Sequence, residues 1–139
     1  MSEKKNTLHL KVITPERVLF DGEVNKYTVK VKGEVGDFSV LPNKSPQTVT
    51  LGLGKIIFSL PDGKEVEATL FGGYAVVETY ESIIMTDVAE WANEIDIPRA
   101  EKAKERAQKR IDDSNADYYR ALAALTRALV RIDVGNAVG

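Results

Sequence analysis

The chain has 139 residues, of which 43% are hydrophobic and 29% charged, and its formal net charge is -2. This length accommodates one ordinary domain or a small domain with an appendage, and the near-zero charge argues against a nucleic-acid-binding protein. The absence of cysteine excludes disulfides and thiolate metal sites.

Charge is unevenly distributed, with 10 basic and 14 acidic residues in residues 1–94 but 9 and 7 in residues 95–139. This asymmetry favours a chain of two parts. The polar start, residues 1–6, does not resemble a signal peptide, and no apolar run approaches the ~20 residues of a membrane span. We therefore expect any association with a membrane to be made through a partner.

Short strands separated by turns are predicted for the first two thirds of the chain. Leu8, Leu10 and Val12 alternate with outward-facing residues, as in a half-buried strand. A turn is expected at Asp21-Gly22, and a hairpin at Pro61-Asp62-Gly63, where each residue favours the required backbone angles. Further strands are expected over residues 18–20, 27–31, 38–41, 48–53, 55–60, 65–71, 74–80 and 82–87. Many short strands at this spacing predict an all-β sandwich or flattened barrel.

A helical pattern replaces the strands after residue 95. Pro98 is suited to an early helical position, where its missing N–H would have no partner. A narrow apolar face follows at three- and four-residue steps, and a basic face lies opposite it. The apolar face comprises Ala100, Ala103, Ala107 and Ile111, and the basic face comprises Lys102, Arg106, Lys109 and Arg110.

A second helix is predicted after an interruption at residues 112–115. Ser114 is expected to cap it, with Asp117 near its positive end. A heptad-like apolar stripe is expected at Tyr118, Leu122, Leu125, Leu129 and Ile132. The short connection predicts an antiparallel hairpin. Because two narrow stripes bury little area, the hairpin requires support from the β-domain, a partner or a ligand.

Asp96 and Arg99 form a candidate ligand site where the first helix begins. As a helix cap, Asp96 would accept the N–H of Arg99, because Pro98 has none to donate. Alternatively, its carboxylate would accept a hydrogen bond from a ligand. A cation is disfavoured near the positive end of a helix, so Arg99 is better explained by a bound anion than by solvent exposure.

The antiparallel hairpin is expected to bring Arg127 and Arg131 close to Arg99. One possibility is that nearby acids neutralise the three guanidinium groups, the available ones being Glu90, Asp96 and Asp133. The other is that a polyanion such as a nucleotide phosphate chain does so, since guanidinium groups match phosphate oxygens. The residues alone leave both possibilities open.

Evidence for catalysis is weak. The single histidine, His9, lies on a predicted strand without a visible relay partner, which favours a surface histidine over a catalytic base. The sequence has no Walker-type glycine-rich loop and no set of residues with metal-ligand spacing. We therefore predict neither catalytic nor metal-binding residues.

The sequence resembles the epsilon subunit of bacterial F-type ATP synthases over nearly its whole length. Seven short runs carry the likeness, and their order and spacing are specific. They are residues 10–17, 36–38, 40–43, 72–73, 95–100, 103–107 and 127–131. The sequence departs from the family at Ser39, where a glycine is usual, and at residues 44–47, where the family has His-Ala-Pro-Leu.

The resemblance implies a β + α fold with two parts. Residues 1–90 would form a flattened ten-stranded β-sandwich, and residues 91–139 a hinge and an antiparallel two-helix hairpin. The chain would be a non-catalytic central-stalk (rotor) subunit, coupling proton or sodium flow to ATP synthesis. Its sandwich would contact the gamma subunit and the c-ring at the cytoplasmic face of the plasma membrane. The extended hairpin would reach the alpha and beta subunits and inhibit ATP hydrolysis.

The resemblance also implies a regulatory ATP site on the folded hairpin, with ATP as ligand rather than substrate. Its signature is Ile-Asp-x-x-Arg-Ala at residues 95–100, Glu90 would lie near the adenine, and the second-helix arginines would face the phosphates. The implied site comprises Glu90, Ile95, Asp96, Arg99, Ala100, Arg127 and Arg131. The requirement for magnesium is left open.

Two other classes of function are alternatives to this interpretation. One is a non-catalytic β-sandwich binding module with a helical tail for assembly. The other is nucleotide hydrolysis by this chain alone, which would require a metal-bound phosphate loop and a water-activating base, and the sequence contains neither.

Overall fold

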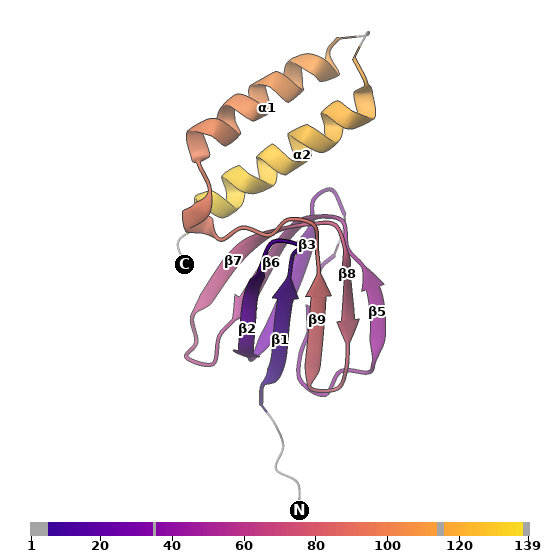
Figure 1. The fold of residues 1–139 in the computed structure, drawn as a ribbon, viewed down its shortest axis with the longest axis vertical. Helices are drawn as coiled ribbons and strands as arrows, with labels where there is room; N and C mark the ends of the chain where they lie inside the picture. The colour runs from indigo at the N-terminus through magenta and orange to yellow at the C-terminus, as the bar shows by residue number, and fades with distance from the viewer. Residues whose placement is uncertain (1–5, 35, 114–115, 138–139) are drawn as a thin grey trace, which may run out of the picture.

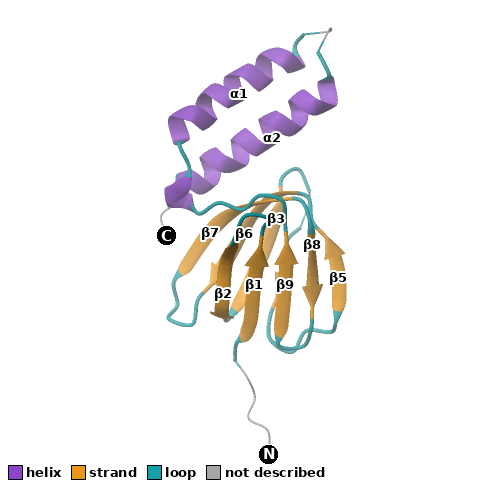
Figure 2. Cartoon of the chain, viewed as in Figure 1, coloured by secondary structure: helices purple, strands orange, loops and turns teal. Residues whose placement is uncertain are grey.

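The computed structural model describes residues 6–34, 36–113 and 116–137, which form a β-sandwich followed by a helical hairpin (Figure 1). The described residues contain nine strands rather than the ten expected (Figure 2). The strands are β1 (Leu8–Ile13), β2 (Val18–Val24), β3 (Lys26–Val31), β4 (Phe38–Val40), β5 (Gln47–Thr50), β6 (Leu53–Ser59), β7 (Glu65–Phe71), β8 (Tyr74–Val77) and β9 (Glu81–Met85). A 3-10 turn, η1 (Ala92–Glu94), precedes helices α1 (Ile97–Ile111) and α2 (Tyr118–Gly135).

Two sheets face each other across the core. One has the strand order β2-β1-β9-β8-β5 and the other β4-β3-β6-β7. All pairings are antiparallel except that of β1 with β9. This parallel pair joins the first strand to the last strand before the hinge, so both ends of the sandwich segment are fixed in one sheet.

The alternation predicted for the first strand is confirmed, since the side chains of Leu8, Leu10 and Val12 are at most 1% exposed. They pack in a core that is closed by aromatic and branched side chains from both sheets. Its largest fully buried members also include Tyr27, Phe58, Ile56, Leu70 and Ile84. Burial of this apolar surface provides the main stabilisation of the sandwich.

Of the two predicted turns, one is confirmed and one is wrong. The hairpin at residues 61–63 joins antiparallel β6 and β7, and Gly63 adopts a φ of 91°. Asp21 and Gly22 do not turn, because they lie within β2 opposite Lys11 and Leu10. Pairing with β1 overrides the local turn preference, and a Cβ at Gly22 would stand in ordinary van der Waals contact with the ring of Phe20, at 3.4 Å.

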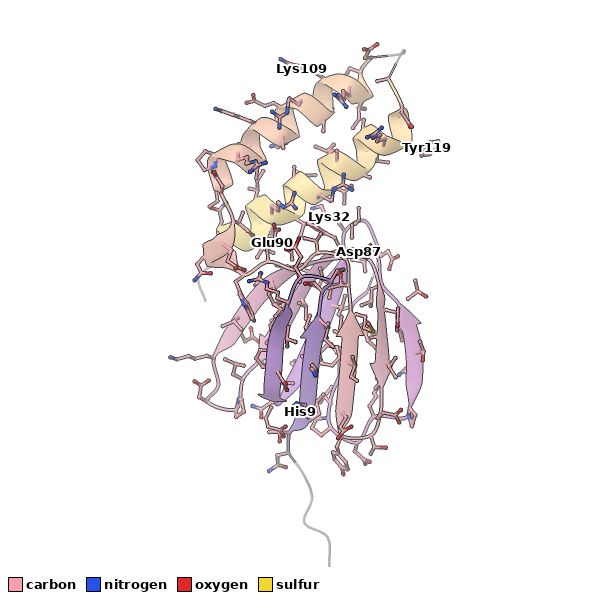
Figure 3. The ribbon with its side chains drawn as sticks, in the orientation of Figure 1. His9, Lys32, Asp87, Glu90, Lys109 and Tyr119 are labelled. Atoms are coloured by element: carbon pink, nitrogen blue, oxygen red, sulfur yellow. The ribbon has the colours of Figure 1, made fainter. Side chains whose placement is uncertain are left out.

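His9 is a surface residue, as predicted. Its Nε2 lies 2.5 Å from Asp21 Oδ1 and its Nδ1 lies 2.9 Å from Glu23 Oε2. Hydrogen bonds to Asp21 and then to Glu23 raise the pKa of His9 above its ordinary value. The histidine therefore links β1 to the edge strand β2 and is remote from the hinge (Figure 3).

The two helices form the predicted antiparallel hairpin (Figure 1). Asp96 caps α1 by accepting the Arg99 N–H at 3.1 Å, and the alanine face is confirmed by the burial of Ala100 and Ala107. The predicted cap of α2 is wrong: the helix starts at Tyr118 and Asp117 accepts the Arg120 N–H at 3.2 Å. Ser114 lies outside the described residues.

The stripe predicted on α2 is also wrong at its beginning. Tyr118 and Leu122 are 51% and 40% exposed, whereas Ala121 and Ala128 are buried. Small side chains on both helices let the two backbones approach closely, so the larger residues are displaced to the flanks. Nearer the C-terminus, Val130 and Val134 pack in a cluster with Phe71 of β7, so this part of α2 lies on the sandwich.

Gly73 provides a test of the sheet geometry. Its φ is 95°, and an added Cβ would overlap the carbonyl group of Met85 on the neighbouring strand. We expect Gly73→Ala to cost ~1–2 kcal/mol for the left-handed backbone and a further ~1–3 kcal/mol for overpacking. Urea unfolding followed by circular dichroism measures the sum.

Gly63→Ala is the matched control, because Gly63 has a φ of 91° with nothing within 4 Å of an added Cβ. This variant should show the backbone cost alone. Equal losses of stability in the two variants would contradict the overlap at Gly73.

Candidate functional site

The hinge begins as an extension of the sandwich. After β9 the chain runs beside β7, where the Phe71 N–H donates to the Val88 carbonyl at 3.0 Å and the Thr69 N–H donates to the Glu90 carbonyl at 2.9 Å. The ring of Trp91 then packs on that of Phe58, with centroids 5.2 Å apart. The chain is therefore held by the sandwich as far as Trp91, and Glu90 lies at the junction with the helices (Figure 3).

The 3-10 turn is held by a bidentate ion pair. Both terminal nitrogens of Arg17, in the loop between β1 and β2, donate to Glu94, at 2.6 and 2.7 Å. Glu94 also accepts the backbone N–H of Trp91 at 2.9 Å. The bonds from Arg17 and then Trp91 lower the pKa of Glu94. Arg17 further donates to the Ala89 carbonyl at 3.2 Å, which fixes the hinge on both sides of Glu90.

The end of α2 docks on the sandwich through apolar contacts and a paired arginine. Phe71, Val130 and Val134 form a small buried cluster, which is flanked by partly buried hydrophobic residues. Arg131 lies over the ring of Phe71, 5.0 Å from its centroid, and its Nε donates to Glu90 Oε1 at 2.9 Å. The guanidinium group is thus held by a ring face and by a carboxylate of the sandwich.

A second charged contact adjoins the first. Lys55 Nζ of β6 lies 3.0 Å from Glu67 Oε1 and 2.9 Å from Asp133 Oδ2 of α2, and its side chain is only 18% exposed. Burial lowers the pKa of Lys55, but hydrogen bonds with Asp133 and Glu67 outweigh this effect and raise it above its ordinary value. Lys55 therefore stays charged and holds α2 against the sheet.

A cavity of about 420 Å³ lies between the hinge and the two helices. We call it the hinge cavity, and its volume is within the usual range for small-molecule sites. Its lining residues are Glu90, Glu94, Ile95, Asp96, Arg99, Ala100, Ala103, Arg106 and Arg131. Of the seven residues predicted for the site, the cavity brings together six, and Arg127 is not among its lining residues.

Arg106, which the sequence analysis placed on the basic face opposite the alanines, is exposed and lines the hinge cavity. It stands seven residues after Arg99, which is two helical turns along nearly the same side of α1. That spacing was a usable signal in the sequence. It was missed because the alanine face alone was used to orient the helix.

Three guanidinium groups line the hinge cavity, those of Arg99, Arg106 and Arg131. Arg131 is paired with Glu90 through Nε. Among residues 6–34, 36–113 and 116–137, Arg99 and Arg106 have no carboxylate within salt-bridge distance. Two arginines without a carboxylate partner thus face one cavity, and guanidinium groups are suited to binding an anion.

The three acids that line the hinge cavity do not neutralise these two arginines. Glu90 accepts from Arg131, Glu94 is held by Arg17, and Asp96 accepts the backbone N–H that it caps. The remaining acid considered from the sequence, Asp133, binds Lys55 instead. Three of these four acids are thus paired with basic residues other than Arg99 and Arg106, and Asp96 caps the backbone of α1.

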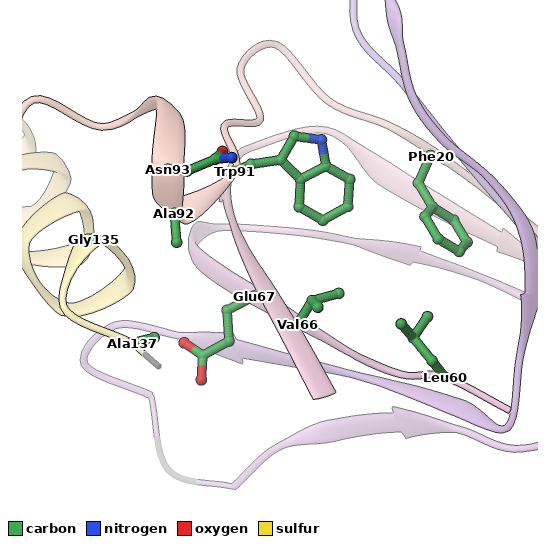
Figure 4. A pocket seen from close by; sticks show the side chains of 9 residues that line it. All are labelled: Phe20, Leu60, Val66, Glu67, Trp91, Ala92, Asn93, Gly135 and Ala137. Carbon is green, nitrogen blue, oxygen red and sulfur yellow. The ribbon is translucent and has the colours of Figure 1, made fainter. Parts of the chain in front are cut away.

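A larger cavity of about 710 Å³ lies beside the C-terminal end of α2 (Figure 4). Phe20, Leu60, Val66 and Trp91 make its walls mainly apolar, and Glu67 is the one charged residue among the described residues that line it. Because its only charge is negative, this apolar cavity does not suit a phosphate. The hinge cavity is accordingly the better candidate for a charged ligand.

The fold and the hinge define a two-part protein, a β-sandwich with a docked helical hairpin. Family models divide the chain in the same order: residues 7–92 match the beta-sandwich domain of the ATP synthase delta/epsilon chain, and residues 93–136 match its long alpha-helix domain. The chain belongs to the ATP synthase delta/epsilon family.

Several bacterial epsilon chains are similar to this chain. The sodium ion specific ATP synthase epsilon chain of Acetobacterium woodii is 43% identical over 111 residues, which are 80% of this chain and 82% of that one. The epsilon chain of Caldicellulosiruptor bescii is 40% identical over 91% of this chain and 92% of its own length. The epsilon chain of Nitratidesulfovibrio vulgaris is 37% identical over 96% and 99%.

Solved structures show the same fold at low identity. A chain of the Euglena gracilis mitochondrial ATP synthase superposes with a TM-score of 0.78 at 20% identity, covering 95% of this chain and 82% of that one. A chain of the Tetrahymena thermophila mitochondrial central stalk and c-ring gives 0.65 at 14%, covering 97% and 100%.

These findings confirm the resemblance to a bacterial F-type epsilon subunit, which is a non-catalytic subunit. Membership of this family replaces the alternative interpretation of the chain as a general β-sandwich binding module with a helical tail for assembly. In the described parts of the chain, no helix is long and apolar enough to cross a bilayer. The domain boundary predicted between residues 90 and 91 stays a prediction.

The ion pair of Arg17 with Glu94 predicts a pH dependence of stability. The folded-state pKa of Glu94 is below the ordinary 4.5, so the pair stabilises the fold above that pH. The contribution is lost as the pH falls through the folded-state pKa. Because both side chains are partly exposed, we expect Arg17→Met to cost only ~0.5–1 kcal/mol at pH 7. As the pH falls below 4.5, this difference should shrink to the pH-independent cost of losing the bond from Arg17 to the Ala89 carbonyl, as measured by urea unfolding.

The control is the same substitution in a Glu94→Gln background. There the cost of Arg17→Met should no longer change with pH over this range. A pH-independent difference in the parent background would show that Arg17 acts through a partner other than the Glu94 carboxylate.

Proposed function

We propose that this chain is the regulatory epsilon subunit of an F-type central stalk, and that its folded hairpin binds ATP in the hinge cavity. The observation that carries the proposal is the pair of arginines, Arg99 and Arg106, that face the cavity without carboxylate partners among the described residues. Phosphate oxygens are the natural complement to guanidinium groups.

The proposed binding mode distributes the ligand over three elements. Arg99 and Arg106 of α1 bind the phosphates, assisted by the positive end of the same helix. Arg131 of α2 keeps its Nε bond to Glu90, which leaves the two terminal nitrogens for phosphate oxygens. Asp96 uses Oδ1 as the helix cap, so Oδ2 is left to accept from a ligand hydroxyl.

The remaining predicted residues take supporting roles in this proposal. Ile95 and Ala100 supply apolar surface around the base, and Glu90 lies at its edge. Arg127 stands one helical turn before Arg131 on α2 and attracts the phosphates from outside the cavity lining. In this arrangement the arginines supply the positive charge that faces the phosphates.

Binding at this position would make the hairpin a sensor. Because the cavity consists of the hinge, α1 and α2, it exists only while the hairpin is folded. A ligand that binds the folded state alone stabilises it by RT ln(1 + [L]/Kd), which is ~1.4 kcal/mol at ten times Kd. In the proposed cycle, loss of ATP lets the hairpin extend toward the alpha and beta subunits and inhibit ATP hydrolysis.

The proposed place of the chain in the cell follows from the family. We propose that the sandwich contacts the gamma subunit and the c-ring, turns with the rotor, and couples ion flow to ATP synthesis at the cytoplasmic face of the plasma membrane. Family membership supports this assignment, as does the similarity to a chain from a solved central stalk and c-ring assembly.

Calorimetric titration with ATP tests the site. Arg99→Ala removes a charged hydrogen bond worth ~1.5–3 kcal/mol and should weaken binding by at least tenfold. Asp96→Asn should also weaken binding while α1 stays capped, because asparagine is an equally good cap residue. Lys102→Ala is the control, since Lys102 is exposed on the same helix and does not line the hinge cavity. Parent-like affinity of Arg99→Ala would remove the proposed site.

Inhibition is tested by weakening the docked state. Lys55→Met removes the contact with Asp133 and should cost the docked hairpin ~1 kcal/mol, which favours undocking about fivefold. Hydrogen exchange at the end of α2 should quicken, and synthase reconstituted with this variant should hydrolyse ATP more slowly than the parent at the same ATP concentration.

Lys30→Met is the control, because Lys30 pairs at 3.6 Å with the exposed Asp37 of the sandwich rather than with a residue of the hairpin. It should leave both measurements unchanged. Faster exchange in Lys55→Met without any change in hydrolysis would separate undocking from inhibition and refute the proposed mechanism.

A further inference from the structure

Thr69 makes several hydrogen bonds to Glu90, one of the residues that line the hinge cavity. It lies in β7, its side chain is fully buried, and it joins Glu90 by three hydrogen bonds. The Thr69 N–H donates to the Glu90 carbonyl at 2.9 Å, and the Glu90 N–H donates to Thr69 Oγ1 at 2.9 Å. Thr69 Oγ1 in turn donates to Glu90 Oε1 at 3.2 Å.

The hydroxyl group is therefore fixed in one orientation. Because Oγ1 accepts from the Glu90 backbone, its single proton is directed to the Glu90 carboxylate. The same oxygen, Oε1, also accepts from Arg131 Nε at 2.9 Å. A continuous chain of hydrogen bonds thus runs from the interior of the sandwich through Glu90 to an arginine that lines the cavity.

We propose that Thr69 is a positioning residue, which holds Glu90 against Arg131 and so keeps Arg99 and Arg106 available for the phosphates of a nucleotide. Without the hydroxyl, the Glu90 carboxylate is free to turn toward these unpaired cations, which line the same cavity. It would then compete with an anionic ligand. The inference rests on the proposed function of the hinge cavity.

A pair of substitutions separates this role from simple packing. Thr69→Val keeps the shape of the side chain and removes the hydroxyl, whereas Thr69→Ser keeps the hydroxyl and removes the methyl group. If Thr69 positions Glu90, Thr69→Ser binds ATP within twofold of the parent and Thr69→Val binds at least tenfold more weakly, as measured by calorimetry on the full chain. The opposite order, or equal losses in both, overturns the proposal.

Two further variants serve as a control and as a replacement in this comparison. Thr28→Val removes a buried hydroxyl from β3, where it bonds to Ser39 Oγ at 2.9 Å, and it should leave ATP affinity unchanged. If Thr69→Val does not fold, Thr69→Ala replaces it, because the difference between alanine and serine again isolates the hydroxyl.

A readout without nucleotide separates this proposal from the proposed function. In ¹H–¹⁵N spectra, the Arg131 Nε–H resonance should carry the signature of a carboxylate bond in the parent and in Thr69→Ser. It should move toward the position of an exposed arginine in Thr69→Val. An unmoved resonance overturns the positioning role, whereas a parent chain that fails to bind ATP overturns the proposed function alone.

Discussion

The docking of the last turns of α2 on β6 and β7 is the contact on which the rest of the structure depends. The buried cluster that carries it, Phe71 with Val130 and Val134, is small beside the core of the sandwich. Because hydrophobic stabilisation scales with buried area, this joint is weaker than the domain that it joins. A weak joint on a stable support is what a movable element requires, because a ligand can change its equilibrium without unfolding the sandwich.

The suitability of the hinge cavity for an anion depends on two arginines, Arg99 and Arg106, that have no carboxylate partner among the described residues. Each nearby acid is engaged: Glu90 with Arg131, Glu94 with Arg17, and Asp96 with the start of α1. One of these partners, Arg17, belongs to the first loop of the sandwich, so the sandwich contributes to the charge balance of a cavity that the hairpin shares. Two arginines without a carboxylate partner among the described residues thereby face the cavity in a chain whose net charge is slightly negative.

Much of the fold could be predicted because it depends on local pattern. Alternation identified the first strand, Pro61-Asp62-Gly63 identified a hairpin, and the alanine repeat identified the buried face of α1. The errors arose where tertiary contacts decide: Asp21-Gly22 is paired into a sheet, and the face of α2 is set by close approach to α1. Within the site, periodicity could not show that Arg127 stays outside the cavity lining, or that the buried hydroxyl of Thr69 is bonded to a cavity acid.

The two charged contacts at the docked end of α2 also specify its position. Arg131 offers a cation to Glu90, and two residues further on Asp133 offers an anion to Lys55. A displacement of α2 that combined a shift along its axis with a rotation, and so moved one residue toward the other's partner, would set arginine against lysine, or aspartate against glutamate. Like charges at such distances repel, so contacts of modest strength can still select one register. The hinge cavity requires this register, because only the observed docking brings Arg131 to the same cavity as Arg99 and Arg106.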